Sequence, residues 1–140
     1  MTCDQCGAAA DCRALFDVML AREFSREQPW GRLHGLTVTV TALQHPEWPD
    51  WRAGLDGYWT SLHVYVIHGL DSAERMWSTA RGHGLPELAD VPPLGQPAPP
   101  YPVTIADVAG PGGDFPADGH EQRVDGWARA TYDARSAVPR

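Results

Sequence analysis

Three cysteines near the start of the sequence are the residues whose types and spacing most clearly suggest chemistry. Cys3 and Cys6 form a Cys-x-x-Cys pair that is followed by Gly7, and Cys12 lies six residues after Cys6. Two thiols around a tight turn are typical of a zinc knuckle, whereas a redox dithiol is expected between a strand and a helix. No strand pattern precedes Cys3, so the sequence favours metal binding over thiol redox chemistry.

A tetrahedral zinc site needs four ligands, so a histidine is expected to join the cysteines. His34 and His45 are eleven residues apart, which separates them by about 16 Å along a straight helix. If one helix leaves from Cys12 and the next returns antiparallel, His45 comes back to the cysteines and His34 lies at the far end. The predicted zinc ligands are therefore Cys3, Cys6, Cys12 and His45.

Three further polar side chains are candidates for catalysis: His34, Gln44 and His63. His34 is expected near His63 and His68, where neutral imidazoles could form an acid–base or second metal site. Gln44 could donate a hydrogen bond to a substrate carbonyl or to a backbone carbonyl. The alternative for all of them is an ordinary hydrogen bond in the core or at the surface.

Aromatic residues close to His45 suggest a binding pocket. Trp48 and Trp51 lie in a loop that also contains prolines and Asp50, and Tyr58 follows in the next predicted helix. Aromatic side chains of this kind could wall a pocket for a small molecule. Packing in the core or the loop is the alternative role.

Apolar spacing and capping residues predict several helices. The first begins after Asp11 and ends before Pro29, with an apolar stripe that includes Phe24 and leaves Glu23 outside it. Residues 54–69 form a largely buried helix, and Ser72 caps a shorter helix that ends at Gly82 and Gly84. Thr104 caps a single turn, and the last helix spans residues 120–135.

Residues 34–45 are ambiguous on pattern alone. The run Leu-Thr-Val-Thr-Val-Thr from Leu36 to Thr41 alternates as a strand does and is rich in β-branched residues. Leu33, Leu36, Val40 and Leu43 also fit a helical stripe. The pattern of these residues is therefore compatible with either a strand or a helix.

Motifs along nearly the whole chain resemble a family of bacterial proteins known as domain of unknown function 5946. The motifs are Cys3-x-x-Cys6-Gly7, Cys12, His34-Gly-Leu-Thr-Val, Ala42-Leu-Gln-His45-Pro46, Thr104-Ile-Ala-Asp107-Val108 and Trp127-Ala128. The resemblance implies a metal-binding helical domain and a helix between the two histidines, but no reaction. This chain has Thr39 and Thr41 where the family carries Asp-x-Tyr, and Tyr58-Trp59 where it carries His-Leu.

Together these observations predict a mainly α fold: a compact helical bundle of one domain over residues 1–140. A metal knuckle spans residues 1–12, and a proline-rich extended strap spans residues 91–103. The net charge of −7 and the scattered arginines argue against nucleic acid as a partner. The absence of a long apolar run or signal-peptide pattern argues against a membrane span and for a cytoplasmic protein.

Two functions fit these features. The first is an enzyme of small-molecule biosynthesis, with histidines and tryptophans lining a pocket and one coordination position of the metal left open. The second is a binding or regulatory module in which zinc has four protein ligands and is purely structural. A redox sensor that uses the dithiol is a weaker third hypothesis.

Overall fold

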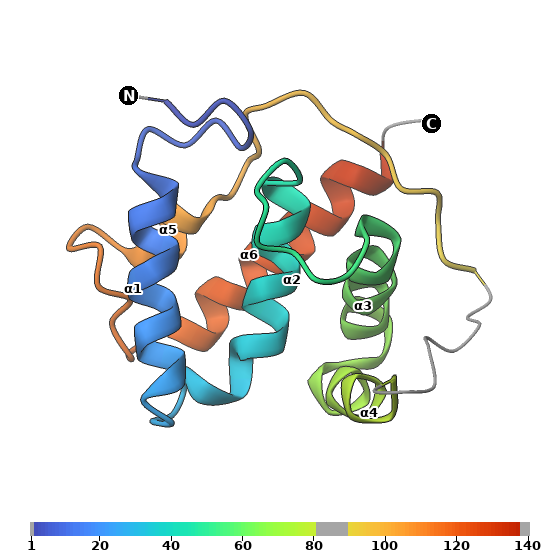
Figure 1. The fold of residues 1–140 in the computed structure, drawn as a ribbon, viewed down its shortest axis with the longest axis horizontal. Helices are drawn as coiled ribbons and strands as arrows, with labels where there is room; N and C mark the ends of the chain where they lie inside the picture. Colours follow the sequence, from blue (N-terminus) through green and yellow to red (C-terminus); the bar gives the residue numbers. More distant parts are fainter. Residues whose placement is uncertain (1, 81–89, 138–140) are drawn as a thin grey trace.

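The computed structural model describes residues 2–80 and 90–137, and these ranges contain helices and no strand. The predicted mainly helical fold is therefore confirmed (Figure 1). The elements in chain order are α1 (Cys12–Phe24), the 3-10 turn η1 (Gly31–Leu33), α2 (His34–Gln44), α3 (Leu55–His68), α4 (Leu70–Ala80), α5 (Ile105–Ala109) and α6 (His120–Ser136).

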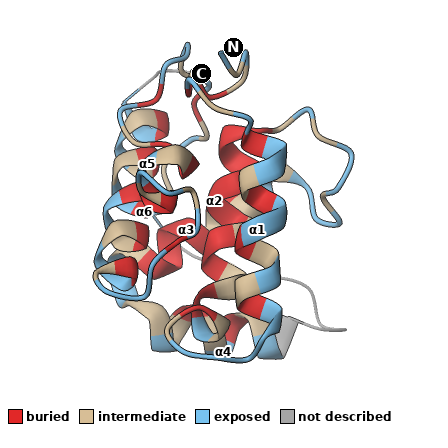
Figure 2. Ribbon diagram, turned by 90° about the vertical axis from the view of Figure 1, so that its left-hand side faces the viewer, coloured by how far each residue is buried: buried red, intermediate tan, exposed pale blue. Residues whose placement is uncertain are grey.

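Helix α2 lies at the centre of the bundle. It contacts α1, α3 and α6, and Figure 1 shows it between α1 and α3. Eight of its eleven residues are buried, because neighbours cover it on several sides. Figure 2 shows the buried part of α1 on the side that faces α2.

The central position of α2 explains why its sequence resembles a strand. Neighbouring helices cover α2 on more than one side, so its buried residues do not form a single apolar stripe at helical spacing. The Thr39 hydroxyl donates to the Gly35 carbonyl at 2.8 Å, and the Thr41 hydroxyl donates to the Thr37 carbonyl at 2.7 Å. Buried threonines can thus satisfy their hydroxyls inside a helix, and the helical alternative is the correct one.

The prediction for α1 was right about its bounds, since the helix begins after Asp11 and ends at Phe24, before Pro29, but wrong about its apolar stripe near the C-terminal end. The Asp11 carboxylate accepts a hydrogen bond from the Ala14 backbone N–H at 3.1 Å, as expected of an N-cap. Phe24, placed in the apolar stripe, is 67% exposed, whereas Glu23, placed outside it, is 3% exposed. Side chains of α2 hydrogen-bond with the Glu23 carboxylate, and helical periodicity cannot reveal such partners.

Two other helix starts were predicted from capping residues. The Ser72 prediction was wrong: α4 begins at Leu70, directly after Gly69, whose φ of +92° ends α3. The predicted end of that helix at Gly82 and Gly84 lies outside the described residues. The Thr104 prediction was right, because the Asp107 carboxylate accepts from the Thr104 backbone N–H in a capping box before α5.

Residues 91–103 contain neither helix nor strand and cross from α3 to the N-terminal knuckle (Figure 1). The Trp59 indole donates to the Pro92 carbonyl at 2.7 Å. Further along, the Tyr101 backbone N–H donates to the Cys6 carbonyl at 2.9 Å. This segment is therefore fixed to α3 at one end and to the knuckle at the other.

None of the helices within the described ranges is both long enough and apolar enough to span a bilayer.

Candidate metal centre

The knuckle is a tight loop that brings Cys3 and Cys6 together. The Cys3 backbone N–H donates to the Ala8 carbonyl, and the Gly7 N–H donates to the Cys3 carbonyl, both at 2.8 Å. Gly7 has a φ of +86°, and a Cβ there would lie 2.5 Å from Pro100. Only glycine fits this turn without strain, which is what the Cys-x-x-Cys-Gly spacing predicts.

Cys12 is supplied by the first residue of α1. The Asp11 cap fixes the start of the helix and therefore the position of Cys12. The Cys6 and Cys12 sulfurs lie 3.6 Å apart, and both residues are buried. Two sulfurs that bind zinc at about 2.3 Å with a tetrahedral angle would lie about 3.8 Å apart, so the observed separation fits a shared ion.

His45 completes the cluster from the C-terminal end of α2. Its Nδ1 faces the Thr41 carbonyl at 2.9 Å, which assigns the ring proton to Nδ1. Its Nε2 is buried and has no hydrogen-bond partner among the described residues. A histidine that donates from one nitrogen and leaves the other lone pair free has the arrangement of a metal ligand.

The four candidate ligand atoms converge on one point. Each of Cys3, Cys6, Cys12 and His45 offers one atom, and these atoms all lie within 4.8 Å of one another. Cys3 is partly buried and the other three residues are buried. The cluster could therefore hold a metal ion, and the orphaned His45 nitrogen independently fits that use.

Electrostatics in the cluster favour a thiolate. The Cys12 thiol lowers the pKa of Cys6 from 9 to about 4, although burial opposes this shift. The same contact raises the pKa of Cys12, because two buried sulfurs this close share one proton. A divalent cation would replace that proton and neutralise both sulfurs.

Trp48 and Trp51 surround His45. The Trp48 ring stacks on the imidazole with centroids 4.1 Å apart, and the Trp51 indole donates to the His45 carbonyl at 2.8 Å. Arg13 lies over the Trp48 ring at 4.6 Å and forms an ion pair with Asp50 at 2.6 Å. These contacts orient the candidate fourth ligand, and the predicted substrate-binding role of the two tryptophans stays a prediction.

The three predicted catalytic residues lie in three different places. His34 lines a pocket of about 300 Å³ between α2, α3 and α4, together with Tyr58. His63 is buried, and its Nδ1 lies 2.8 Å from the Tyr132 hydroxyl of α6. Burial, and then the charge of His68, lowers the pKa of His63. Within the described ranges, these histidines form no second group of three metal ligands.

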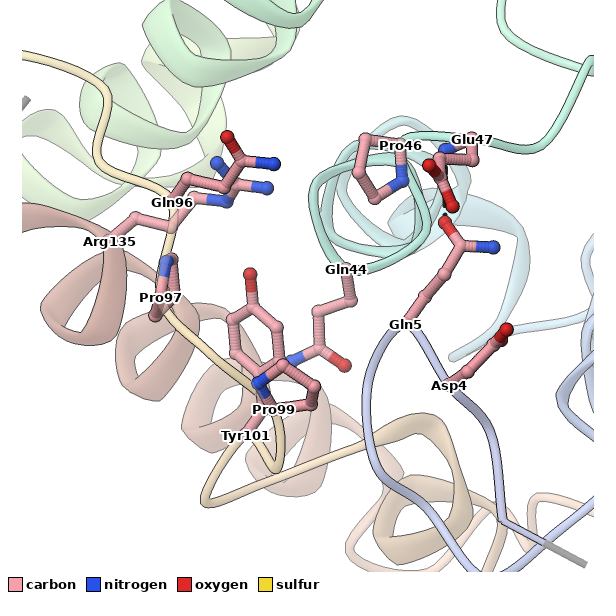
Figure 3. Close-up of a pocket in the computed structure, with 10 residues that line it drawn as sticks. All are labelled: Asp4, Gln5, Gln44, Pro46, Glu47, Gln96, Pro97, Pro99, Tyr101 and Arg135. Carbon is pink, nitrogen blue, oxygen red and sulfur yellow. Dashed lines mark hydrogen bonds between the residues drawn. The ribbon is translucent and has the colours of Figure 1, made fainter.

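Gln44 lines a different pocket, of about 170 Å³, beside the knuckle (Figure 3). Its side-chain N–H₂ donates to the Val103 carbonyl and the Thr131 hydroxyl, both at 2.8 Å. Thr131 donates in turn to the Trp127 carbonyl, so it can only accept from Gln44. The amide orientation is thereby fixed, and its buried oxygen has no partner among the described residues.

Two buried charged residues were not predicted from the sequence. Arg135 of α6 is 2% exposed and donates to the Leu43 and Gly95 carbonyls, closing the C-terminal end of α2. Glu23 accepts hydrogen bonds from His34 and Thr37. Both depend on contacts between distant segments, and no local motif marks either residue.

The fold and this cluster define a small helical domain with three cysteines and one histidine that could hold a metal ion. The chain belongs to the family described as Family of unknown function (DUF5946), whose model matches residues 1–136. This match confirms the resemblance found in the motifs. Comparisons with curated proteins and with solved structures gave no match.

Proposed function

We propose that the cluster binds one zinc ion as a structural centre and that the protein binds a small apolar molecule elsewhere in the bundle. The observation that carries the zinc proposal is the free, buried Nε2 of His45 beside three sulfurs. Three thiolates and one imidazole complete a tetrahedral zinc site, and they leave no coordination position for a substrate. The ion would then join the knuckle to the start of α1 and the end of α2.

The pocket between α2, α3 and α4 supports the second half of the proposal. It measures about 300 Å³ and is lined mainly by apolar groups: His34, Gly35, Val38, Thr39, Ala53, Gly57, Tyr58, Ser61 and Trp77. The Thr39 and Ser61 hydroxyls already donate to backbone carbonyls of their own helices. A molecule with about one aromatic ring fits this volume and this lining.

The zinc proposal is tested by metal analysis of matched histidine variants. The protein as purified should carry one equivalent of zinc, and His45→Ala should lose it. His34→Ala should retain it, because His34 lies at the other end of α2. If His45→Ala keeps its metal, or if His34→Ala loses it, the ligand set is wrong.

Cobalt substitution tests whether the site is closed. Co²⁺ bound by three thiolates and one imidazole gives intense charge-transfer and tetrahedral d–d absorption bands. The bands should stay unchanged when azide is added, because four protein ligands leave no place for an exogenous anion. A change on addition of azide would show an open position and would favour the enzyme hypothesis with chemistry at the metal.

The apolar pocket is tested with para-nitroanisole as a probe. Binding should shift the NMR signals of the Trp77 indole and of Gly57. Ala53→Trp places a ring at the pocket and should block binding, whereas Ala21→Trp on the exposed side of α1 should not. Equal binding to both variants would exclude this pocket as the site.

A further inference from the structure

Glu23 is the one carboxylate that is buried among the residues the structure describes, and a buried carboxylate needs partners. One of its oxygens lies 2.6 Å from Nδ1 of His34. The other accepts a hydrogen bond from the Thr37 hydroxyl. Both oxygens therefore face groups of α2, and none of the metal ligands is involved.

His34 connects this buried carboxylate to the apolar pocket. Its side chain is 39% exposed, and it lines the pocket from the first turn of α2. An ionised Glu23 can only accept, so Nδ1 of His34 is the donor in this contact, and the neutral form of the ring would carry its lone pair on Nε2. Among the described residues, the imidazole is hydrogen-bonded through Nδ1, and its ring lies 4.9 Å from the Phe24 ring, centroid to centroid. Nε2 is therefore the nitrogen left for a molecule bound in the pocket that His34 lines.

Among the residues that the structure describes, His34 is the basic group of the pocket lining. The described lining residues include no carboxylate or guanidinium, and the Trp77 indole N–H is already donated to the Ser61 hydroxyl at 3.1 Å. A carboxylate behind an imidazole holds the ring in one tautomer and stabilises the imidazolium that forms when Nε2 takes a proton. His34 therefore has the arrangement of a general base beside the apolar pocket.

We infer that the pocket takes an apolar molecule that carries an acidic hydroxyl group, such as a phenol or an enol, and that His34 accepts the proton of this hydroxyl. This inference rests on the proposed small-molecule function of the same pocket. Glu23 acts as a positioning residue, since it reaches the ligand only through His34.

The proposed step is a proton transfer that needs no other reactant. The ligand's O–H bond breaks, an N–H bond forms at Nε2, and the electron pair of the broken bond stays on the ligand oxygen. The products are an oxyanion and an imidazolium, which pair with each other while the imidazolium also pairs with Glu23. No atom is oxidised or reduced.

The test uses para-nitrophenol, whose anion absorbs in the visible, at a pH where the free phenol is mainly protonated. Addition of the zinc-loaded protein should produce the anion band. The phenol should also bind at least about tenfold more tightly than para-nitroanisole, because it adds a hydrogen bond between charged groups; tenfold corresponds to about 1.4 kcal/mol. Equal affinities without the anion band would overturn the inference and leave the pocket proposal intact.

Variants separate the positioning role of Glu23 from a merely structural one. Glu23→Gln keeps the shape of the side chain but removes its charge, so para-nitroanisole should bind as before while the anion band weakens. His34→Gln removes the proposed base and should abolish the band. An anion band of wild-type strength in either variant would contradict the inference. If neither probe binds the wild type, both the pocket proposal and this inference fail.

Discussion

At the scale of single residues, buried histidines have different environments and therefore different uses. His45 has one free nitrogen beside three sulfurs, whereas neither nitrogen of His120 has a hydrogen-bond partner in the described part of the chain. The His120 ring lies near the Trp30 and Phe115 rings with no candidate ligand atom grouped with it. His45 is therefore a candidate metal ligand, whereas we regard His120 as a neutral core residue.

His120 should make the fold sensitive to acid. Burial, and then the charge of Arg123, lowers its pKa from 6.5 to about 4. Because only the unfolded chain binds this proton between these two pH values, the free energy of unfolding should fall as pH decreases through this range. The full loss below pH 4 is about 3 kcal/mol, and it is absent above pH 6.5.

Urea denaturation of wild type and His120→Leu at pH 7.5 and pH 5 checks this prediction. The variant should lose less stability between the two pH values, because it has no ring to protonate in the unfolded chain. All other titratable groups are the same in the two proteins, so the comparison isolates His120. An identical pH dependence would assign the acid sensitivity to other groups.

At the scale of elements, the features that depend on residues close together in the sequence were predicted correctly. The Cys-x-x-Cys-Gly turn, the Asp11 cap and the Thr104 capping box depend on neighbours within a few residues, and all three form. The pattern of α2 alone was ambiguous, because a helix surrounded by others loses its polar face. Glu23 was misplaced and Arg135 was missed, because their partners lie on other elements and no periodicity encodes such contacts.

The contact of the Trp77 ring of α4 with α2 should depend on Gly35. A Cβ at this position would lie 2.7 Å from the Trp77 ring, so Gly35→Ala should push α4 away. Overpacking outweighs the helix propensity gained from alanine, and the variant should lose about 1–2 kcal/mol of stability. Gly126→Ala in α6 is the matched control, because its Cβ would meet nothing within 4 Å.

The control should gain stability of about 0.5–1 kcal/mol, since alanine is the better helix former at an open position. Chemical denaturation of the three proteins measures both effects. If Gly35→Ala is as stable as Gly126→Ala, the contact between Gly35 and Trp77 does not constrain the position of α4.

At the scale of the whole molecule, the metal cluster connects segments that are far apart in sequence. The candidate ligands come from the knuckle, the first residue of α1 and the residue after α2. The segment 91–103 is attached to the same place, because Tyr101 donates its backbone N–H to the Cys6 carbonyl. The core of α2, α3 and α6 packs without any of these contacts, as Leu36, Val124 and Trp127 are fully buried within it.

Removal of the metal should therefore loosen one end of the molecule before the rest. After treatment with a chelator, hydrogen exchange should accelerate first at the amides of Cys3, Gly7 and Tyr101, whose bonds hold the knuckle. Amides of Val40 and Trp127 should stay protected, and the melting temperature should fall because a ligand specific to the folded state has been lost. Adding zinc back should slow the exchange at these amides again and restore the melting temperature. Equal acceleration at all five amides would mean that the ion supports the whole bundle and that the helical core does not fold without it.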